Sequence, residues 1–230
     1  MLLFTGSRYV QLQQSYRAGA TSYDALRGQV RQVDEENPSD DPFVRSSVDF
    51  EALQKINPDT IGWLYSPQTP IDYPVMKAND YAWYLSHLID GSYNACGTLF
   101  LDYNNAPDFS DKLSVIYGHN MQDDSMFGSL DNYKNQAFLN EHPTMFLFTP
   151  QGNYRVELMY GCVVGAGMWR DRAFMFEVNL ESLLSYASQH TTFTSPVTYA
   201  EGDRVVALST CSYEFDDARY VVIGILKPAK

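Results

Sequence analysis

The chain has 230 residues, enough for one domain, or one domain with an appendage, and for a sizeable hydrophobic core. Its net charge of −12 and its scattered basic residues argue against a nucleic-acid partner, because phosphate binding needs clustered Lys and Arg. An acidic surface suits an amine-bearing partner or serves solubility alone, and no apolar run reaches the roughly 18 residues that a membrane span requires.

A helical extension is predicted over residues 1–57. Residues 8–36 have a loose apolar spacing that favours one or two amphipathic helices, interrupted near Gly19. The acidic segment 34–42 contains two prolines and is interpreted as a solvated linker between this extension and the rest of the chain.

Residues 58–230 are predicted to form one β-rich domain. Runs of β-branched and aromatic residues alternate there with turn residues, which is typical of strands. Several short strands in one domain predict a barrel or a sandwich. The runs are 60–67, 71–76, 97–103, 113–119, 144–150, 154–166, 204–211 and 220–226.

Three short helices are also predicted. Residues 47–57 carry Ser47 as a candidate cap, and residues 125–133 place apolar residues on one face. Residues 178–190 have the same helical spacing after a candidate cap at Asn179 and lie between two predicted strands.

The last two strands predict a reactive thiol. If residues 204–210 and 219–226 pair as a hairpin, Cys211 and Arg219 lie at the same end of it. A neighbouring cation favours the thiolate, which is the nucleophilic form of cysteine. Arg219 could instead pair with an acidic residue of the hairpin tip, Glu214, Asp216 or Asp217.

His119 is the candidate acid and base, because it follows directly on the strand at 113–117, where a rigid scaffold can present a catalytic side chain. Cys96 and Cys162 lie within apolar runs and are interpreted as buried hydrophobic residues. Three cysteines and four histidines without metal-ligand spacing predict neither a disulfide framework nor a metal site.

These segments together resemble one family. "LSTC" (208–211), "ARYVV" (218–222) and "IYGHNMQDDSMFGSL" (116–130) resemble the class B sortases of Gram-positive bacteria, over residues 59–227. The resemblance implies a mainly β fold with helices, namely an eight-stranded sortase-type β-barrel with N-terminal helices and a helix between the sixth and seventh strands. It also implies that residues 58–230 are the catalytic domain.

The resemblance further implies a cysteine transpeptidase. Such an enzyme cleaves a C-terminal sorting motif of a secreted protein after its Thr, and then joins the Thr to a peptidoglycan amine. Cys211 would be the nucleophile that forms the thioester, His119 the acid and then the base, and Arg219 the group that stabilises the oxyanion.

Substrate contacts are expected from the resemblance at Ser209, Asn79 and Leu85. Two extra residues between Asn79 and the Tyr-Leu pair, and Ala207 where a Thr is common, depart from the family pattern. The aromatic run at 173–178 would line the edge of a substrate groove or, equally, belong to the core.

No cofactor or metal is expected, and the acidic residues after His119 are interpreted as solvated. The partners implied are secreted proteins with a sorting motif and a peptidoglycan precursor amine. The intact protein would work at the extracellular face of the cell membrane, tethered by an N-terminal helix. Residues 2–4 are either the last trace of that anchor or an artefact of expression, and the chain as given is expected to be soluble.

Two alternatives remain open. A pilus-polymerising sortase would use a Lys of another pilin subunit as acceptor, and a non-catalytic surface barrel would grip a peptide with Cys211 incidental. A papain-like protease is disfavoured because its cysteine precedes its histidine and begins a helix. An L,D-transpeptidase is disfavoured because its His-Gly-Cys motif is absent.

Overall fold

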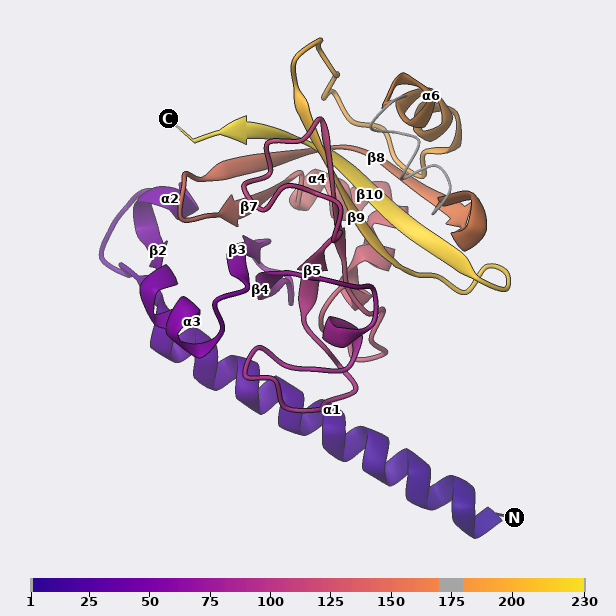
Figure 1. Cartoon of the computed structure of the whole chain (residues 1–230). Helices are drawn as coiled ribbons and strands as arrows, with labels where there is room; N and C mark the ends of the chain where they lie inside the picture. Colours follow the sequence, from indigo (N-terminus) through magenta and orange to yellow (C-terminus); the bar gives the residue numbers. More distant parts are fainter. Residues whose placement is uncertain (1, 170–179, 230) are drawn as a thin grey trace.

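Eight strands close into a barrel in the computed structural model, which describes residues 2–169 and 180–229 (Figure 1). The strand order around the barrel is β10-β8-β7-β3-β4-β5-β6-β9, so the predicted eight-stranded fold is confirmed. Each predicted run overlaps one strand, although β4 and β10 extend beyond their runs. The strands are β3 Thr60–Tyr65, β4 Asp72–Lys77, β5 Leu99–Leu101, β6 Leu113–Tyr117, β7 Thr144–Phe148, β8 Tyr154–Gly165, β9 Arg204–Cys211 and β10 Ala218–Pro228.

The last strands are apolar on both faces because each face is covered. Val206, Leu208 and Val222 belong to the main core, whereas Val205 and Val221 belong to a second buried cluster. Helix α6 (Leu180–His190) contributes Leu180, Leu183, Leu184 and Ala187 to that second cluster.

Helix α6 confirms the helix predicted between the sixth and seventh barrel strands, which are β8 and β9. The candidate cap Asn179 and the aromatic run at 173–178 lie outside the described residues.

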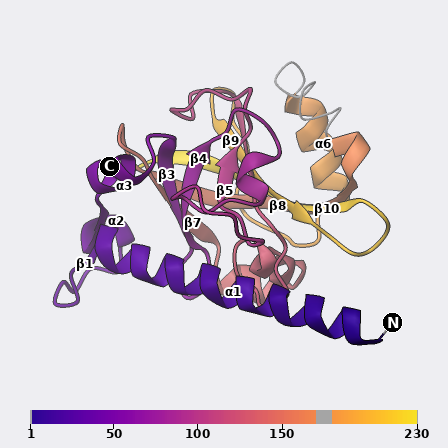
Figure 2. The same ribbon diagram turned by 60° about the horizontal axis from the view of Figure 1, so that its bottom comes forward.

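Helix α1 (Leu2–Val30) runs along one end of the barrel, and its N-terminal half extends beyond it (Figures 1 and 2). The predicted interruption at Gly19 is wrong. A Cβ at this position would lie 2.3 Å from Cys96 Sγ, so the glycine serves close contact with the loop before β5 and does not break the helix. Tyr23, Leu26 and Val30 are buried on one face, and each contributes about 1.5–3 kcal/mol by leaving water.

The segment after α1 folds back on itself. Strands β1 (Arg31–Val33) and β2 (Ser46–Val48) pair antiparallel and enclose the mostly exposed segment 34–42 and the short helix α2 (Pro42–Arg45). Helix α3 (Phe50–Ile56) confirms the helix predicted at 47–57.

The cap predicted for α3 was wrong. Asp49 caps the helix by accepting from the Ala52 N–H, whereas Ser47 lies within β2. Tyr23 and Leu53 share one buried cluster with Trp63 of β3. The extension therefore packs against the barrel, and the division of the chain at residue 57 stays a prediction.

Three short helices lie in the connections between barrel strands. They are η1 (Trp83–Leu85), η2 (Gly128–Lys134) and α4 (Gln136–Glu141). The helix predicted at 125–133 is present mainly as η2, a 3₁₀ helix, with Met126, Phe127 and Leu130 buried.

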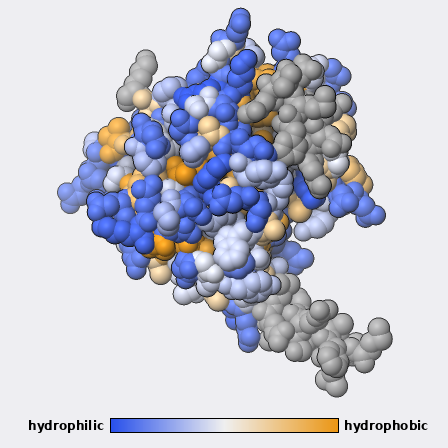
Figure 3. Space-filling view, viewed as in Figure 1, coloured by the Kyte–Doolittle hydropathy of each residue, from blue (hydrophilic) through white to orange (hydrophobic). Residues whose placement is uncertain are grey.

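On the face seen in Figure 3, hydrophilic residues predominate and hydrophobic ones form small separate groups. None of the helices within residues 2–169 and 180–229 combines the length and the apolar character needed to cross a membrane.

Replacing Tyr23 by Phe tests the packing of α1. The Tyr23 hydroxyl is buried, donates to the Gly97 carbonyl at 2.7 Å and lies 2.7 Å from Thr98 Oγ1. Its loss leaves the buried Gly97 carbonyl with only the weak contact from Cys96 Sγ at 3.8 Å, so the free energy of unfolding should fall by about 1–3 kcal/mol in urea titrations.

Tyr16→Phe is the matched control for this substitution. Tyr16 lies on the same helix, is half-buried, and its hydroxyl forms no hydrogen bond with the part of the chain described. Equal effects of the two substitutions would contradict the assigned role of the Tyr23 hydroxyl.

Candidate active site

Parallel pairing brings His119 and Cys211 to one edge of the barrel. Strand β6 pairs parallel with β9 up to Tyr117, which lies opposite Ser209. The two strands therefore run toward the same edge of the barrel. His119 and Cys211 each lie two residues further along. Gly118 N donates to the Ser209 carbonyl at 3.2 Å and continues this pairing.

Gly118 lets the histidine segment pass close to the core. A Cβ at this position would lie 2.4 Å from Leu99 Cδ2 and 2.7 Å from Phe127 Cδ2. A larger residue would push His119 away from the strand end, so this glycine fixes the position of the His119 backbone.

The hairpin prediction for Cys211 and Arg219 is confirmed by the strand register, in which the two residues are direct antiparallel partners. Side chains in such pairs project to the same face, with Cβ atoms about 5 Å apart. Both residues are half-buried. Arg219 forms no salt bridge within the described part of the chain, and Glu214 pairs with Lys134 instead.

A cavity of about 360 Å³ opens at this edge, and it brings together five of the six predicted site residues, namely Cys211, His119, Arg219, Ser209 and Leu85. The position of Arg219 in the cavity wall, directly opposite the thiol, leaves its guanidinium able to meet a substrate carbonyl.

Asn79 lies elsewhere. It is exposed and borders a separate hollow of about 420 Å³ together with Asp80 and Trp83. Tyr81 lines the cavity of Cys211 in its place. Asn79 is thus the one predicted substrate contact that lies outside the cavity of Cys211.

His119 is oriented by a backbone carbonyl. Its Nε2 lies 2.7 Å from the Leu85 carbonyl oxygen, which can only accept, so this nitrogen carries a proton. A neutral ring then keeps its lone pair on Nδ1. The Leu85 carbonyl therefore fixes the orientation of the imidazole ring.

Two unpartnered hydroxyls border the cavity. Ser209 and Thr210 are buried, and within the described residues neither Ser209 Oγ nor Thr210 Oγ1 has a hydrogen-bond partner. Buried hydroxyls are normally paired, so these two are exceptions that lie beside the cavity.

Aromatic rings form one wall of the cavity. The hydroxyls of Tyr81 and Tyr117 each donate to Oδ2 of the buried Asp102 at 3.0 Å. Burial, followed by the charge of Asp102, raises the pKa of Tyr81, so its hydroxyl stays a donor. Phe100 lies opposite Tyr117 in the strand register and extends the wall.

Sequence reasoning missed several cavity residues. Tyr117 and Thr210 are close to predicted residues in the sequence and could have been inferred from them. Tyr81, Phe100 and Trp169 required the strand pairing and the path of the loops.

The other two cysteines are buried, as predicted. Burial raises the pKa of the Cys96 thiol to about 11 and that of the Cys162 thiol to about 12. Both thiols are therefore almost wholly protonated and inert near neutral pH.

Iodoacetamide should thus modify Cys211 first in the folded protein. We expect its rate at pH 7.5 to exceed those of Cys96 and Cys162 by at least about a hundredfold, because the buried thiols are protonated and shielded. Peptide mapping by mass spectrometry over time measures all three rates in one sample. Comparable rates for the three thiols in folded protein would contradict this description of the site.

Comparisons with known proteins come from sequence and from structure. No family model matches the chain. A curated protein named Sortase B from Listeria monocytogenes is 36% identical over 177 residues, which are 76% of this chain and 72% of the relative.

Solved structures give the same result. A C232S mutant of Clostridium perfringens sortase B aligns with a TM-score of 0.71 and 27% identity over 77% of this chain and 86% of its own. A Streptococcus pyogenes class B sortase involved in pilus biogenesis aligns with a TM-score of 0.69 and 30% identity over 78% of this chain and 98% of its own.

Proposed function

The chain belongs to the class B sortases, a family of cysteine transpeptidases, and we propose that it cleaves a sorting motif of a secreted protein after its Thr and transfers the acyl group to a peptidoglycan amine. The observation that carries this proposal is the cavity shared by Cys211, His119 and Arg219 at the parallel strand ends. It supplies a thiol, an acid–base group and a cation in one place.

In the first half of the reaction, His119 Nδ1 takes the proton of the Cys211 thiol, and the resulting thiolate attacks the carbonyl carbon of the substrate Thr. The carbonyl oxygen takes the electron pair, and the Arg219 guanidinium stabilises this oxyanion. The C–N bond then breaks, His119 donates a proton to the departing nitrogen, and a thioester on Cys211 remains. Since Nε2 is held by the Leu85 carbonyl, Nδ1 is the atom that exchanges this proton.

In the second half, the amine attacks the thioester carbon. His119 Nδ1 takes a proton from the amine, and the tetrahedral intermediate expels the Cys211 thiolate as the new amide forms. The thioester conserves the reactivity of the acyl group until the amine arrives. Such an enzyme works at the outer face of the cell membrane, where secreted proteins emerge.

The walls of the cavity suggest how the motif is held. Tyr81, Phe100, Tyr117 and Leu85 offer apolar surface, and the tyrosine hydroxyls are already engaged by Asp102. The unpartnered Ser209 hydroxyl can donate to a backbone carbonyl of the peptide. Apolar packing with a few hydrogen bonds is typical of peptide grooves.

The pilus-polymerising alternative keeps support from one relative, the Streptococcus pyogenes class B sortase involved in pilus biogenesis. The two functions use the same acyl-enzyme and differ only in the acceptor amine. A non-catalytic peptide-binding barrel is the third outcome of the same experiment.

The test is a screen of sorting-motif peptides, each incubated without acceptor, with a short peptide bearing a free N-terminal amine, and with a Lys-containing pilin peptide. We expect cleavage after Thr and transfer to the N-terminal amine, detected by liquid chromatography and mass spectrometry. Cys211→Ala should form no product, because the nucleophile is lost, while Cys162→Ala should keep its rate within about threefold.

Transfer only to the pilin Lys would establish the alternative acceptor. Cleavage that persists in Cys211→Ala, or peptide binding without any cleavage, would contradict the proposed chemistry.

A further inference from the structure

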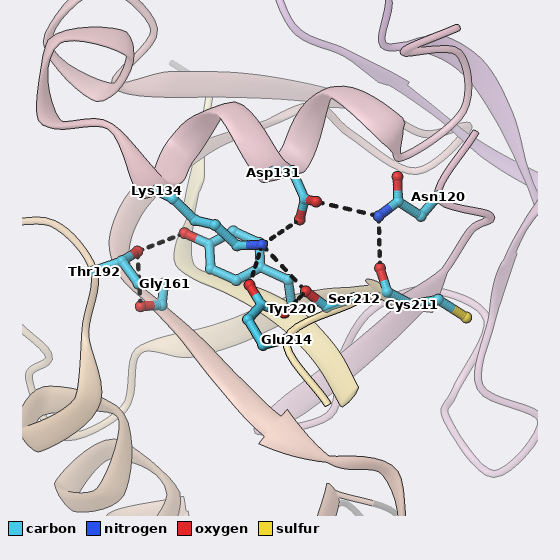
Figure 4. A network of polar contacts seen from close by, with 9 residues as sticks. All are labelled: Asn120, Asp131, Lys134, Gly161, Thr192, Cys211, Ser212, Glu214 and Tyr220. Atoms are coloured by element: carbon cyan, nitrogen blue, oxygen red, sulfur yellow. Dashed lines mark hydrogen bonds and ion pairs between the residues drawn. The ribbon is translucent and has the colours of Figure 1, made fainter. Parts of the chain in front are cut away.

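Lys134, at the end of η2, lies behind the nucleophile, where its ammonium group contacts three polar side chains (Figure 4). Its Nζ is 2.9 Å from Asp131 Oδ1, 2.5 Å from Glu214 Oε1 and 3.1 Å from Ser212 Oγ. The same ammonium lies 4.9 Å from the centre of the buried Tyr220 ring. It therefore contacts both the segment that contains Asp131 and the segment that follows Cys211.

A second connection completes the link. Asn120, next to His119, donates through Nδ2 to the Cys211 carbonyl at 2.8 Å, and the same Nδ2 lies 3.3 Å from Asp131 Oδ2. Figure 4 shows the Cys211 carbonyl turned toward Asn120 and its sulfur turned away from the network. The network thus holds the backbone of the nucleophile and leaves the thiol free to face the cavity.

The network reaches Cys211 and both of its neighbours in the sequence. Lys134 bonds to Ser212, Asn120 bonds to Cys211, and Tyr220 is the strand partner of Thr210. Tyr220 is fixed in turn by its hydroxyl, 2.6 Å from Thr192 Oγ1.

We propose that Lys134 is a positioning residue for the reaction, and that it fixes Cys211 relative to His119 by joining the segments that follow each of them. The proposal rests on the proposed function, since it concerns the same nucleophile. Lys134 contacts protein groups and is not among the residues that line the cavity. It therefore acts on Cys211 through Ser212, and through Asp131 and Asn120, without touching substrate.

The charges agree with this role. Burial by itself lowers the pKa of Lys134, but the hydrogen bonds to Glu214 and Asp131 outweigh it and raise the pKa overall. Burial alone would raise the pKa of Glu214, yet Lys134 and Ser212 hold it below its usual range. Lys134 and Glu214 therefore stay ionised at neutral pH.

An ordinary surface salt bridge is the simpler interpretation, because exposed pairs contribute little to stability. The Lys134 side chain is 29% exposed, and its partners Asp131 and Glu214 are 33% and 38% exposed. These values alone do not separate the two interpretations, whereas the reactivity of Cys211 does.

The test measures the rate at which iodoacetamide alkylates Cys211 at fixed pH in four proteins: wild type, Lys134→Met, Lys134→Arg and Lys55→Met. Met keeps an unbranched side chain of nearly the same length and removes its charge, while Arg keeps the charge. Lys55→Met is the matched control, because it breaks the exposed pair of Lys55 with Glu51, 2.7 Å apart on α3.

We expect the rate of Lys134→Met to fall by about threefold or more, and those of Lys134→Arg and Lys55→Met to stay close to wild type. A role in stability alone would lower the melting temperature and leave this rate unchanged. A wild-type rate in folded Lys134→Met, or a rate in Lys134→Arg as low as in Lys134→Met, would overturn the proposal.

The double variant Asn120→Ala with Lys134→Met tests whether the contact of Asn120 with Cys211 and the contact of Lys134 with Ser212 act as one unit. If they do, the double variant loses no more than the larger single loss, whereas fully additive losses would overturn the proposal. Should Lys134→Met not fold, Glu214→Gln replaces it and is expected to slow alkylation in the same way.

Iodoacetamide reports on the thiol without any substrate. The result therefore remains decisive if no sorting peptide is cleaved, so failure of this proposal and failure of the proposed function are told apart.

Discussion

The parallel pairing of β6 with β9 is the constraint on which the site depends. Parallel neighbours end at the same edge of a sheet, and here that edge receives His119 from one strand and Cys211 from the other. The antiparallel return of β10 then brings Arg219 opposite the cysteine. His119, distant in the sequence from Cys211 and Arg219, meets them because β9 lies between β6 and β10 in the closed barrel.

The histidine has a longer support that reaches α1. Its Nε2 is held by the Leu85 carbonyl, and the preceding Tyr84 carbonyl accepts from Thr98 N at 2.8 Å. Thr98 is in turn bonded to Tyr23 of α1. The N-terminal helix is therefore linked to the scaffold of the site through side-chain and backbone hydrogen bonds, although none of its side chains within the described residues lines the cavity.

Much of the barrel could be predicted from the sequence, because β-branched runs separated by turn residues report directly on strands. The nucleophile hairpin was predictable for the same reason, since it is a local pairing. The interruption predicted at Gly19 was wrong because a glycine is needed there for close contact with Cys96. Helix propensity carries no information on that contact. The position of Asn79 and the bonds of Lys134 likewise depend on loops and strands that only the folded chain brings together.

The central claim is that an acyl-enzyme forms on Cys211, and the most direct measurement is tandem mass spectrometry of protein quenched in acid within milliseconds of mixing with a cleavable peptide. The account predicts an adduct on the peptide that contains Cys211, equal in mass to the substrate up to its Thr and removed by hydroxylamine. Product formation with no adduct on Cys211, or with the adduct on another residue, would contradict it.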